Sequence, residues 1–146
     1  MTTTQLVEAL AVKLRASTDS PLADLEVHVM PQLGLEDPDG SVVVDIAEVS
    51  QIGIAIGEQL EDTASLIIEG RIPFADTEAN RQSLENLAEA IVKVLRENRR
   101  ISAGDGIART NADGPITWVP GFDADRDDLM RTCNVTLKYR KTPDDV

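Results

Sequence analysis

The 146-residue chain has few of the residue types on which most catalytic and metal sites depend. It contains one histidine, His28, and one cysteine, Cys133, so it has no intrachain disulfide. A nucleophilic cysteine needs a base beside it, and these two residues fall in different predicted strands. The motifs G-x-S-x-G, H-E-x-x-H and C-x-x-C and the Walker sequence are all absent from the chain. We therefore expect no enzyme activity, no cofactor and no bound metal.

Aromatic and basic residues are also scarce. Aromatics make up 3% of the chain and apolar residues 42%, so the core must consist mostly of Val, Ile, Leu and Ala. There are 14 Lys and Arg against 26 Asp and Glu, which gives a net charge of −12. Because phosphate binding needs clustered Lys and Arg, we do not expect a basic patch that grips DNA. Passage of DNA through a like-charged channel remains compatible with this charge, and the acidity by itself favours solubility.

Long apolar runs are missing as well. No run approaches the roughly 20 residues that cross a bilayer, and the N-terminus has neither the basic start nor the apolar core of a signal peptide. We expect a soluble protein that is made in a cytoplasm. The length predicts a single domain over residues 1–146, with flexible loops near 31–41 and 102–114 and a frayed tail at 141–146.

Hydrophobic periodicity predicts two helices and several strands. Residues 4–16 place leucines at every fourth position after Thr3 or Thr4 as a cap, and residues 77–98 carry one continuous apolar face. Alternating apolar and polar residues predict strands, at 25–31, 41–51, 51–62, 63–74, 116–120 and 129–139. The glycines at 53 and 57 suggest a bulge or bend in the third of these strands.

This order of elements predicts an α+β fold, a mostly antiparallel sheet with one long central helix and a shorter N-terminal helix packed on it. Two strands have clear core faces. The residues expected to face inward are Ala64, Leu66, Ile68 and Ile72 in one strand and Leu129, Cys133, Val135, Leu137 and Tyr139 in the other. Arg131 interrupts the second of these apolar faces near its start.

An acidic run precedes the last strand, with Asp123, Asp125, Asp127 and Asp128 in six positions. Counted from the first aspartate, positions 1, 3 and 5 supply the oxygen ligands of an EF-hand loop. Position 6 is Asp128 where glycine is needed, and position 12 is Asn134 where a bidentate glutamate is needed. Since half of the calcium cage is missing, we interpret the run as a solvated acidic turn that leads into a core strand.

Three further residues have two interpretations each. Arg99 and Arg100 follow the long helix, where the helix dipole favours cations, but the same pair would also suit a phosphate. Trp118, the only tryptophan, anchors either the core or an interface.

The order of segments resembles the tail terminator and related tail-completion (minor tail) proteins of long-tailed bacteriophages. The resemblance covers most of the chain and is carried by TQLVEALAVKLRA, SVVVDIAEV, LIIEGRIPFADTEANRQ, ENLAEAIVKVLREN and RTCNVTLKYRK. Such proteins are small α+β domains that assemble as rings, commonly hexamers. The ring ends the growing tail tube at its set length and presents a surface to the head connector.

The resemblance implies a structural virion protein at the head-proximal end of the tail, assembled in the host cytoplasm. Its implied partners are other copies of itself in a ring, the tail tube protein and a head-completion or connector protein, with DNA passing through the lumen without specific binding. The residues assigned to interfaces on this basis are Asp123, Asp125, Asp127, Asp128, Arg99, Arg100 and Trp118. The alternatives are another neck or adaptor protein, or a small non-enzymatic binding domain.

Overall fold

The computed structural model describes residues 2–29, 40–53, 60–103, 106–110, 116–123 and 130–143. Two helices, a 3₁₀ turn and seven strands lie in these ranges. In chain order they are α1 (Thr3–Arg15), η1 (Leu22–Asp24), β1 (Glu26–Val29), β2 (Ser41–Gly53), β3 (Leu60–Pro73), α2 (Glu78–Glu97), β4 (Arg100–Ala103), β5 (Gly106–Thr110), β6 (Trp118–Asp123) and β7 (Met130–Pro143).

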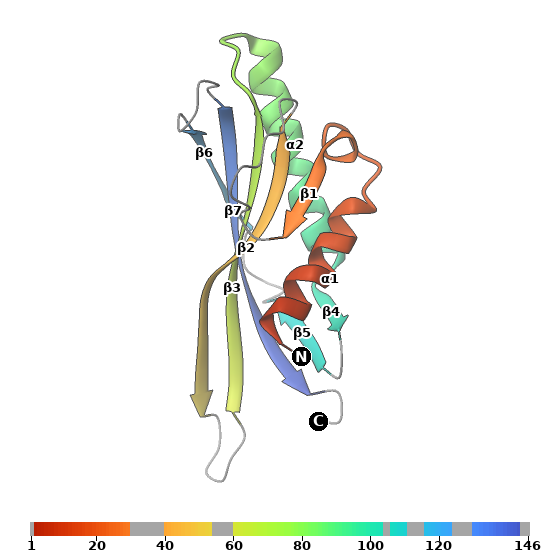
Figure 1. Cartoon of the computed structure of the whole chain (residues 1–146), viewed down its shortest axis with the longest axis vertical. Helices are drawn as coiled ribbons and strands as arrows, with labels where there is room; N and C mark the ends of the chain where they lie inside the picture. The colour runs from red at the N-terminus through yellow and green to blue at the C-terminus, as the bar shows by residue number, and fades with distance from the viewer. Residues whose placement is uncertain are drawn as a thin grey trace.

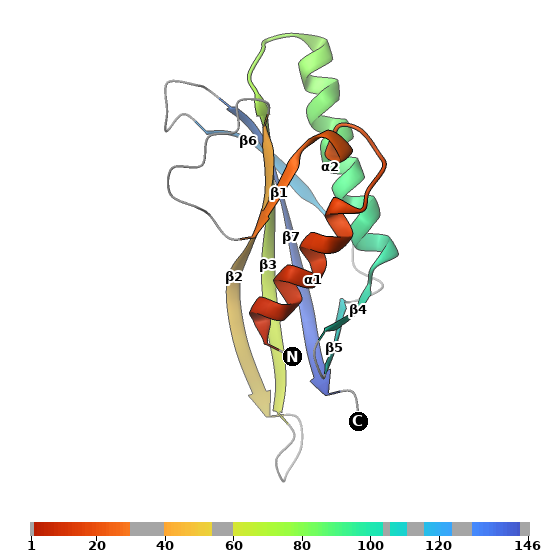
Figure 2. The ribbon, with the colours of Figure 1, turned by 45° about the vertical axis from the view of Figure 1, so that its right-hand side comes forward.

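The seven strands form one sheet that curls into a half-barrel (Figures 1 and 2). The strand order is β1-β2-β3-β7-β5-β4, and β6 pairs with β7 beside this path. Strands account for 48% of the structure, so the fold is strand-rich. The predicted α+β fold class was wrong, because the curled sheet and not the helices dominates the structure. Periodicity locates elements but does not show that β2, β3 and β7 are each 13 or 14 residues long, and sheets of long strands twist and curl.

The strand β2 differs from the prediction in two ways. It runs without a break through the predicted boundary at residue 51, and its register with β3 shifts between Ile46 and Glu48 and not at Gly53. A bulge places two residues opposite one and increases the local twist, which alternation of side chains does not reveal. The other predicted site of the bend, Gly57, lies outside the described residues.

Pairing in the sheet is mixed. The predicted antiparallel pattern holds for β2 with β3 and for β3 with β7. However, β1 runs parallel to β2, from Glu26 opposite Ser41 to Val29 opposite Val44.

The predicted loop at 102–114 was wrong at residues 102–103, which end β4, and at residues 106–110, which form β5. This strand pairs with β4 on one side and with the C-terminal half of β7 on the other. Its residues Ile107, Ala108 and Thr110 are buried. The glycine-rich composition concealed the strand because its stability comes from pairing with the adjacent β4 and the distant β7 and not from local propensity. Residues 104–105 and 111–115 lie outside the described part of the chain, as do residues 31–39 of the other predicted loop. The predicted frayed tail at 141–146 was wrong over residues 141–143, which belong to β7, and residues 144–146 lie outside the described part.

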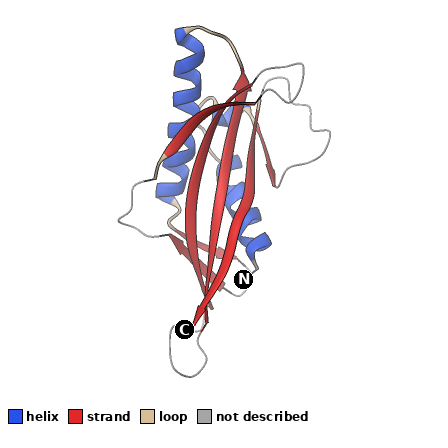
Figure 3. Ribbon diagram, turned by 90° about the vertical axis from the view of Figure 1, so that its left-hand side faces the viewer, coloured by secondary structure: helices blue, strands red, loops and turns tan. Residues whose placement is uncertain are grey.

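Both helices begin as the sequence indicates, within one or two residues. The side chain of Thr2 caps α1 through the N–H of Gln5, and the side chain of Thr77 caps α2 through the N–H of Asn80. Both helices lie on the same side of the sheet in Figures 2 and 3. Their apolar faces share one core with the sheet, and the residues predicted to face inward in β3 and β7 are buried, apart from Leu129, which lies outside the described residues.

The helix α2 packs closely against the centre of the sheet at Gly70 of β3. A Cβ atom at this glycine would lie 2.8 Å from Cys133 Sγ and 2.8 Å from Leu87 Cδ2. The missing side chain therefore allows α2 to sit directly over the β3–β7 pair. Further along β7, the Tyr139 hydroxyl donates a hydrogen bond of 3.3 Å to the carbonyl oxygen of Asn98, at the end of α2.

Candidate interface

The residues of the predicted interface that the structure describes, Arg99, Arg100, Trp118 and Asp123, do not gather at one place. Trp118 begins β6 opposite Val135, whereas Arg100 begins β4, two strands away from the C-terminal half of β7. Arg99 and Arg100 are exposed, and Trp118 is half-buried and packs against the core. Asp123 is the last residue of β6. The remaining predicted aspartates, Asp125, Asp127 and Asp128, lie outside the described residues.

A row of arginines crosses three adjacent strands. Arg100 of β4 lies opposite Arg109 of β5, which lies opposite Arg140 of β7. All three are exposed, whereas the neighbouring residues Ile101 and Ala108 face the core. The row is therefore on the sheet face that points away from the helices, and adjacent strands are about 4.8 Å apart. We call these three residues the arginine ladder.

The ladder places like charges opposite one another on neighbouring strands. Like charges directly opposite each other on neighbouring strands repel, typically at a cost of about 0.2–1 kcal/mol for each pair. Lys138 adds a further exposed positive charge on the same face of β7. An anionic surface placed over the ladder would turn this repulsion into attraction.

Acidic residues are concentrated elsewhere in the chain. Residues 16–70 contain 12 Asp and Glu and no Lys or Arg, whereas the rest of the chain contains 14 residues of each sign. This segment therefore carries the whole net charge of −12, and it supplies η1, β1, β2 and most of β3. This concentration of acidic residues can be found in the sequence, but the net charge of the whole chain does not reveal it.

Because of this uneven composition, the two edges of the sheet carry charges of opposite sign. On the face away from the helices, Glu48 of β2 lies opposite Ser65 of β3, which lies opposite Lys138 of β7. Asp45 lies on the same face of β2 and is half-buried. The sheet thus has an acidic edge at β2, defined by Asp45 and Glu48, and a basic edge formed by the arginine ladder.

A second surface feature lies at the other end of β7. The rings of Phe74 and Phe122 meet edge to face with centroids 5.6 Å apart, and the guanidinium carbon of Arg131 lies 5.3 Å and 5.5 Å from the two centroids. Arginine is attracted to aromatic ring faces at such distances. This contact explains how a charged residue is accommodated on the apolar face of β7. Phe122 is 63% exposed, so the cluster presents an aromatic ring to the surface.

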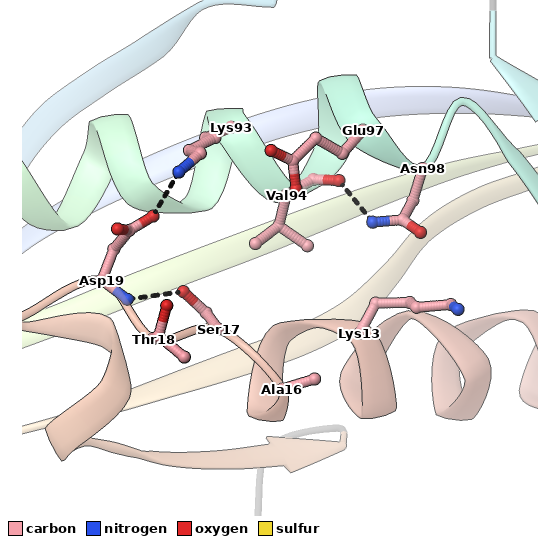
Figure 4. A pocket seen from close by; sticks show the side chains of 9 residues that line it. All are labelled: Lys13, Ala16, Ser17, Thr18, Asp19, Lys93, Val94, Glu97 and Asn98. Atoms are coloured by element: carbon pink, nitrogen blue, oxygen red, sulfur yellow. Dashed lines mark hydrogen bonds and ion pairs between the residues drawn. The ribbon is translucent and has the colours of Figure 1, made fainter.

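The hollow between the end of α1 and α2 has a volume of about 220 Å³ (Figure 4). The Lys93 ammonium lies 3.0 Å from a carboxylate oxygen of Asp19, and this hydrogen bond raises the pKa of Lys93. Both side chains remain well exposed to solvent. The residues lining the hollow are Lys13, Ala16, Ser17, Thr18, Asp19, Lys93, Val94, Glu97 and Asn98. Solvent screens such an exposed pair, so the arrangement assigns no chemistry to this hollow.

Cys133 is a buried residue of the core, as the alternation in its strand predicts. Burial raises the pKa of its thiol to about 11, so the thiolate needed for nucleophilic chemistry is scarce at neutral pH. His28 belongs to β1, is half-buried, and has its Nε2 atom 3.4 Å from a carboxylate oxygen of Glu26.

The described ranges contain neither a metal-binding cluster nor a helix that could span a membrane. There, no group of three or more His, Cys, Asp and Glu side chains is placed to hold a metal ion. Neither helix in the same ranges combines the length and apolar character needed to cross a membrane.

Comparison with solved structures gives a similarity of fold. No protein-family model matches the sequence, and no curated protein matches it. A chain from the virion of a native gene transfer agent particle is similar in structure, with a TM-score of 0.57 and 16% sequence identity. The match covers 94% of this chain and 96% of that chain. At this identity the likeness is one of fold.

Proposed function

We propose that the chain is a non-enzymatic structural virion protein, a tail terminator that forms a ring on the head-proximal end of a phage-type tail. The observation that carries the proposal is the fold shared with a chain of a gene transfer agent virion over nearly the full length of both chains. The sequence resemblance to tail terminators supports the same proposal independently of the shared fold, because it depends only on the order of segments in the sequence.

The surface of the sheet suits repeated contacts between copies. In the described residues, β1 pairs only with Ser41–Val44 of β2, so no strand covers the outer side of the remainder of β2. Open strand edges pair readily with another chain. The proposed ring, commonly a hexamer in the proteins it resembles, would contact the tail tube protein on one side and a head-completion or connector protein on the other.

The charge of the chain is compatible with a DNA channel. A lumen lined by part of the acidic segment would repel phosphates and let DNA slide through without binding. The alternative proposals are another neck or adaptor protein of similar size, and a small binding domain. These would differ in stoichiometry, since an adaptor of another neck layer could assemble as a dodecamer and a binding domain would stay monomeric or dimeric.

Electron microscopy and mass photometry of the purified chain, alone and with tail tubes, would test the proposal. We expect rings with a mass near six copies and density on one end of each tube. Twelve-copy rings would support the adaptor alternative. Single copies or dimers at high concentration, with no density on tube ends, would contradict the proposed function.

A further inference from the structure

We infer that copies of this chain dock head-to-tail, with the arginine ladder of one copy against the acidic β2 edge of the next. This inference rests on the proposed function as a ring-forming protein and identifies the surface that would build the ring. Both surfaces belong to the same copy and lie at opposite edges of one sheet.

The net charge favours a contact with local attraction. Copies that each carry −12 repel one another at long range, and a contact at which opposite charges meet offsets part of this repulsion. The ladder is a row of three exposed arginines. The acidic β2 edge comes from the 16–70 segment, which contains no Lys or Arg to weaken the attraction.

The placement of these surfaces favours a second copy as the partner. Two different surfaces on opposite edges make a heterologous contact, which repeats from copy to copy and forms a ring when the rotation closes. In the described residues, β4 and the part of β2 beyond Val44 also lack a strand on their outer sides. The outer backbone groups of these strands are therefore placed for pairing between copies.

A nucleic acid fits the same observations less well. Duplex DNA would contact the ladder and leave the acidic β2 edge without a partner. The remainder of the acidic segment would also repel the phosphates of DNA held close to the sheet. A second copy uses both charged edges at once.

Charge reversal of each edge provides a direct test. One variant carries Arg100→Glu and Arg109→Glu, and the other carries Asp45→Lys and Glu48→Lys. In either variant alone, both edges have the same sign, so we expect ring formation to need at least about tenfold higher concentration, since like charges brought together across an interface cost several kcal/mol. In an equimolar mixture the reversed edges attract each other, so we expect rings of alternating variants. Mass photometry and sedimentation velocity at low salt would measure both effects.

Two further sets of variants complete the test. A control with Arg81→Glu and Arg96→Glu changes the net charge by the same amount as the ladder variant, on exposed positions of α2, and should assemble as the unmodified chain does. Because Asp45 also accepts a hydrogen bond of 2.7 Å from the Ile46 N–H, the single changes Glu48→Lys and Arg109→Glu repeat the mixing test without disturbing Asp45.

The outcomes distinguish the inference from the proposed function. If the unmodified chain forms rings and the charge-reversed variants also do so alone, the inference is wrong and the proposed function stands. If the ladder variant keeps its rings but loses binding to duplex DNA, the ladder is a phosphate-binding surface and the inference is again wrong. If the unmodified chain forms no rings even with tail tubes, both are wrong.

Discussion

The two edges of the sheet flank the same central strands, β3 and β7, but differ in charge. Both the β2 edge and the β4–β5 edge flank the β3–β7 pair, beneath which α2 packs. One edge comes from a segment with no basic residue, and the other carries the arginine ladder. The side of the sheet that faces the helices is one shared apolar core, which stabilises both edges. The opposite side is exposed to solvent, so its two edges can carry opposite charges without disturbing that core.

The largest loss of stability is expected from a change in the core that lies under both edges of the sheet. Leu87 of α2 is fully buried beside Gly70, and Leu87→Ala should lower the free energy of unfolding by about 2–5 kcal/mol, because it removes apolar contacts and leaves a cavity. Urea unfolding followed by the fluorescence of Trp118 would measure this loss. The control Val12→Ala changes an exposed residue of α1 and should alter stability by less than about 0.5 kcal/mol. Equal effects for the two variants would contradict the packing described for α2.

A somewhat smaller effect is expected from filling the space at Gly70. Gly70→Ala should cost about 1–3 kcal/mol, because the new methyl group would force α2 and Cys133 away from β3. In the matched change Gly121→Ala, the added atom meets only the hydroxyl of Thr132 within close range, so we expect a smaller loss. Thermal unfolding of both variants would test whether α2 or β6 is packed more tightly against the sheet.

The buried thiol of Cys133, at the centre of the sheet, predicts that the stability of the fold depends on pH. The pKa of Cys133 is raised by burial from 9.0 to about 11, so the unfolded chain loses this proton at lower pH than the folded chain. Its contribution to stability should be complete below pH 9 and decline as the pH rises from about 9 to about 11, by at most about 1.4 kcal/mol per pH unit.

Comparison with Cys133→Ala would isolate this dependence. Burial also raises the pKa of Tyr139, so the tyrosine contribution remains in the variant and the difference between the two curves reports the thiol. Urea unfolding from pH 8 to pH 11 is the measurement. Parallel curves for the two proteins would show that the thiol is accessible to water.

The smallest effect should sharpen the contrast between the two edges. Arg109→Gln removes the central charge of the ladder, so the isolated chain should gain roughly 0.2–1 kcal/mol for each repulsive pair removed. Glu48→Gln on the acidic β2 edge should bring no comparable gain, because its cross-strand neighbour is the uncharged Ser65. Thermal unfolding at low and high salt would measure both, and the gain should shrink as salt screens the charges. A loss of stability in Arg109→Gln would contradict repulsion within the ladder.

Local signals predicted a large part of the secondary structure. Caps and periodicity located both helices within one or two residues, and alternation identified the buried faces of β3 and β7. They failed at β5, which is short and glycine-flanked and is held by β4 and β7. They also failed for the class of the fold, because the length and curl of the strands depend on pairing along the whole sheet.

The candidate interface could be predicted only in part. Arg100 was assigned to an interface from its place after the long helix, but nothing near it in the sequence points to Arg109 or Arg140. These residues become neighbours only through the register of β4 with β5 and of β5 with β7. The acidic segment, in contrast, is visible in the composition once it is examined by region.

The sequence by itself determined where the helices begin, which side chains face the core, and that all the net negative charge belongs to residues 16–70. These properties depend on a residue and its near neighbours in the chain. Only the tertiary structure decided that the sheet is a curled half-barrel, that β1 lies parallel to β2, and that three arginines align across its basic edge. Strand neighbours and register are set by contacts between distant segments, and the best combined burial and hydrogen bonding of all the strands selects them together.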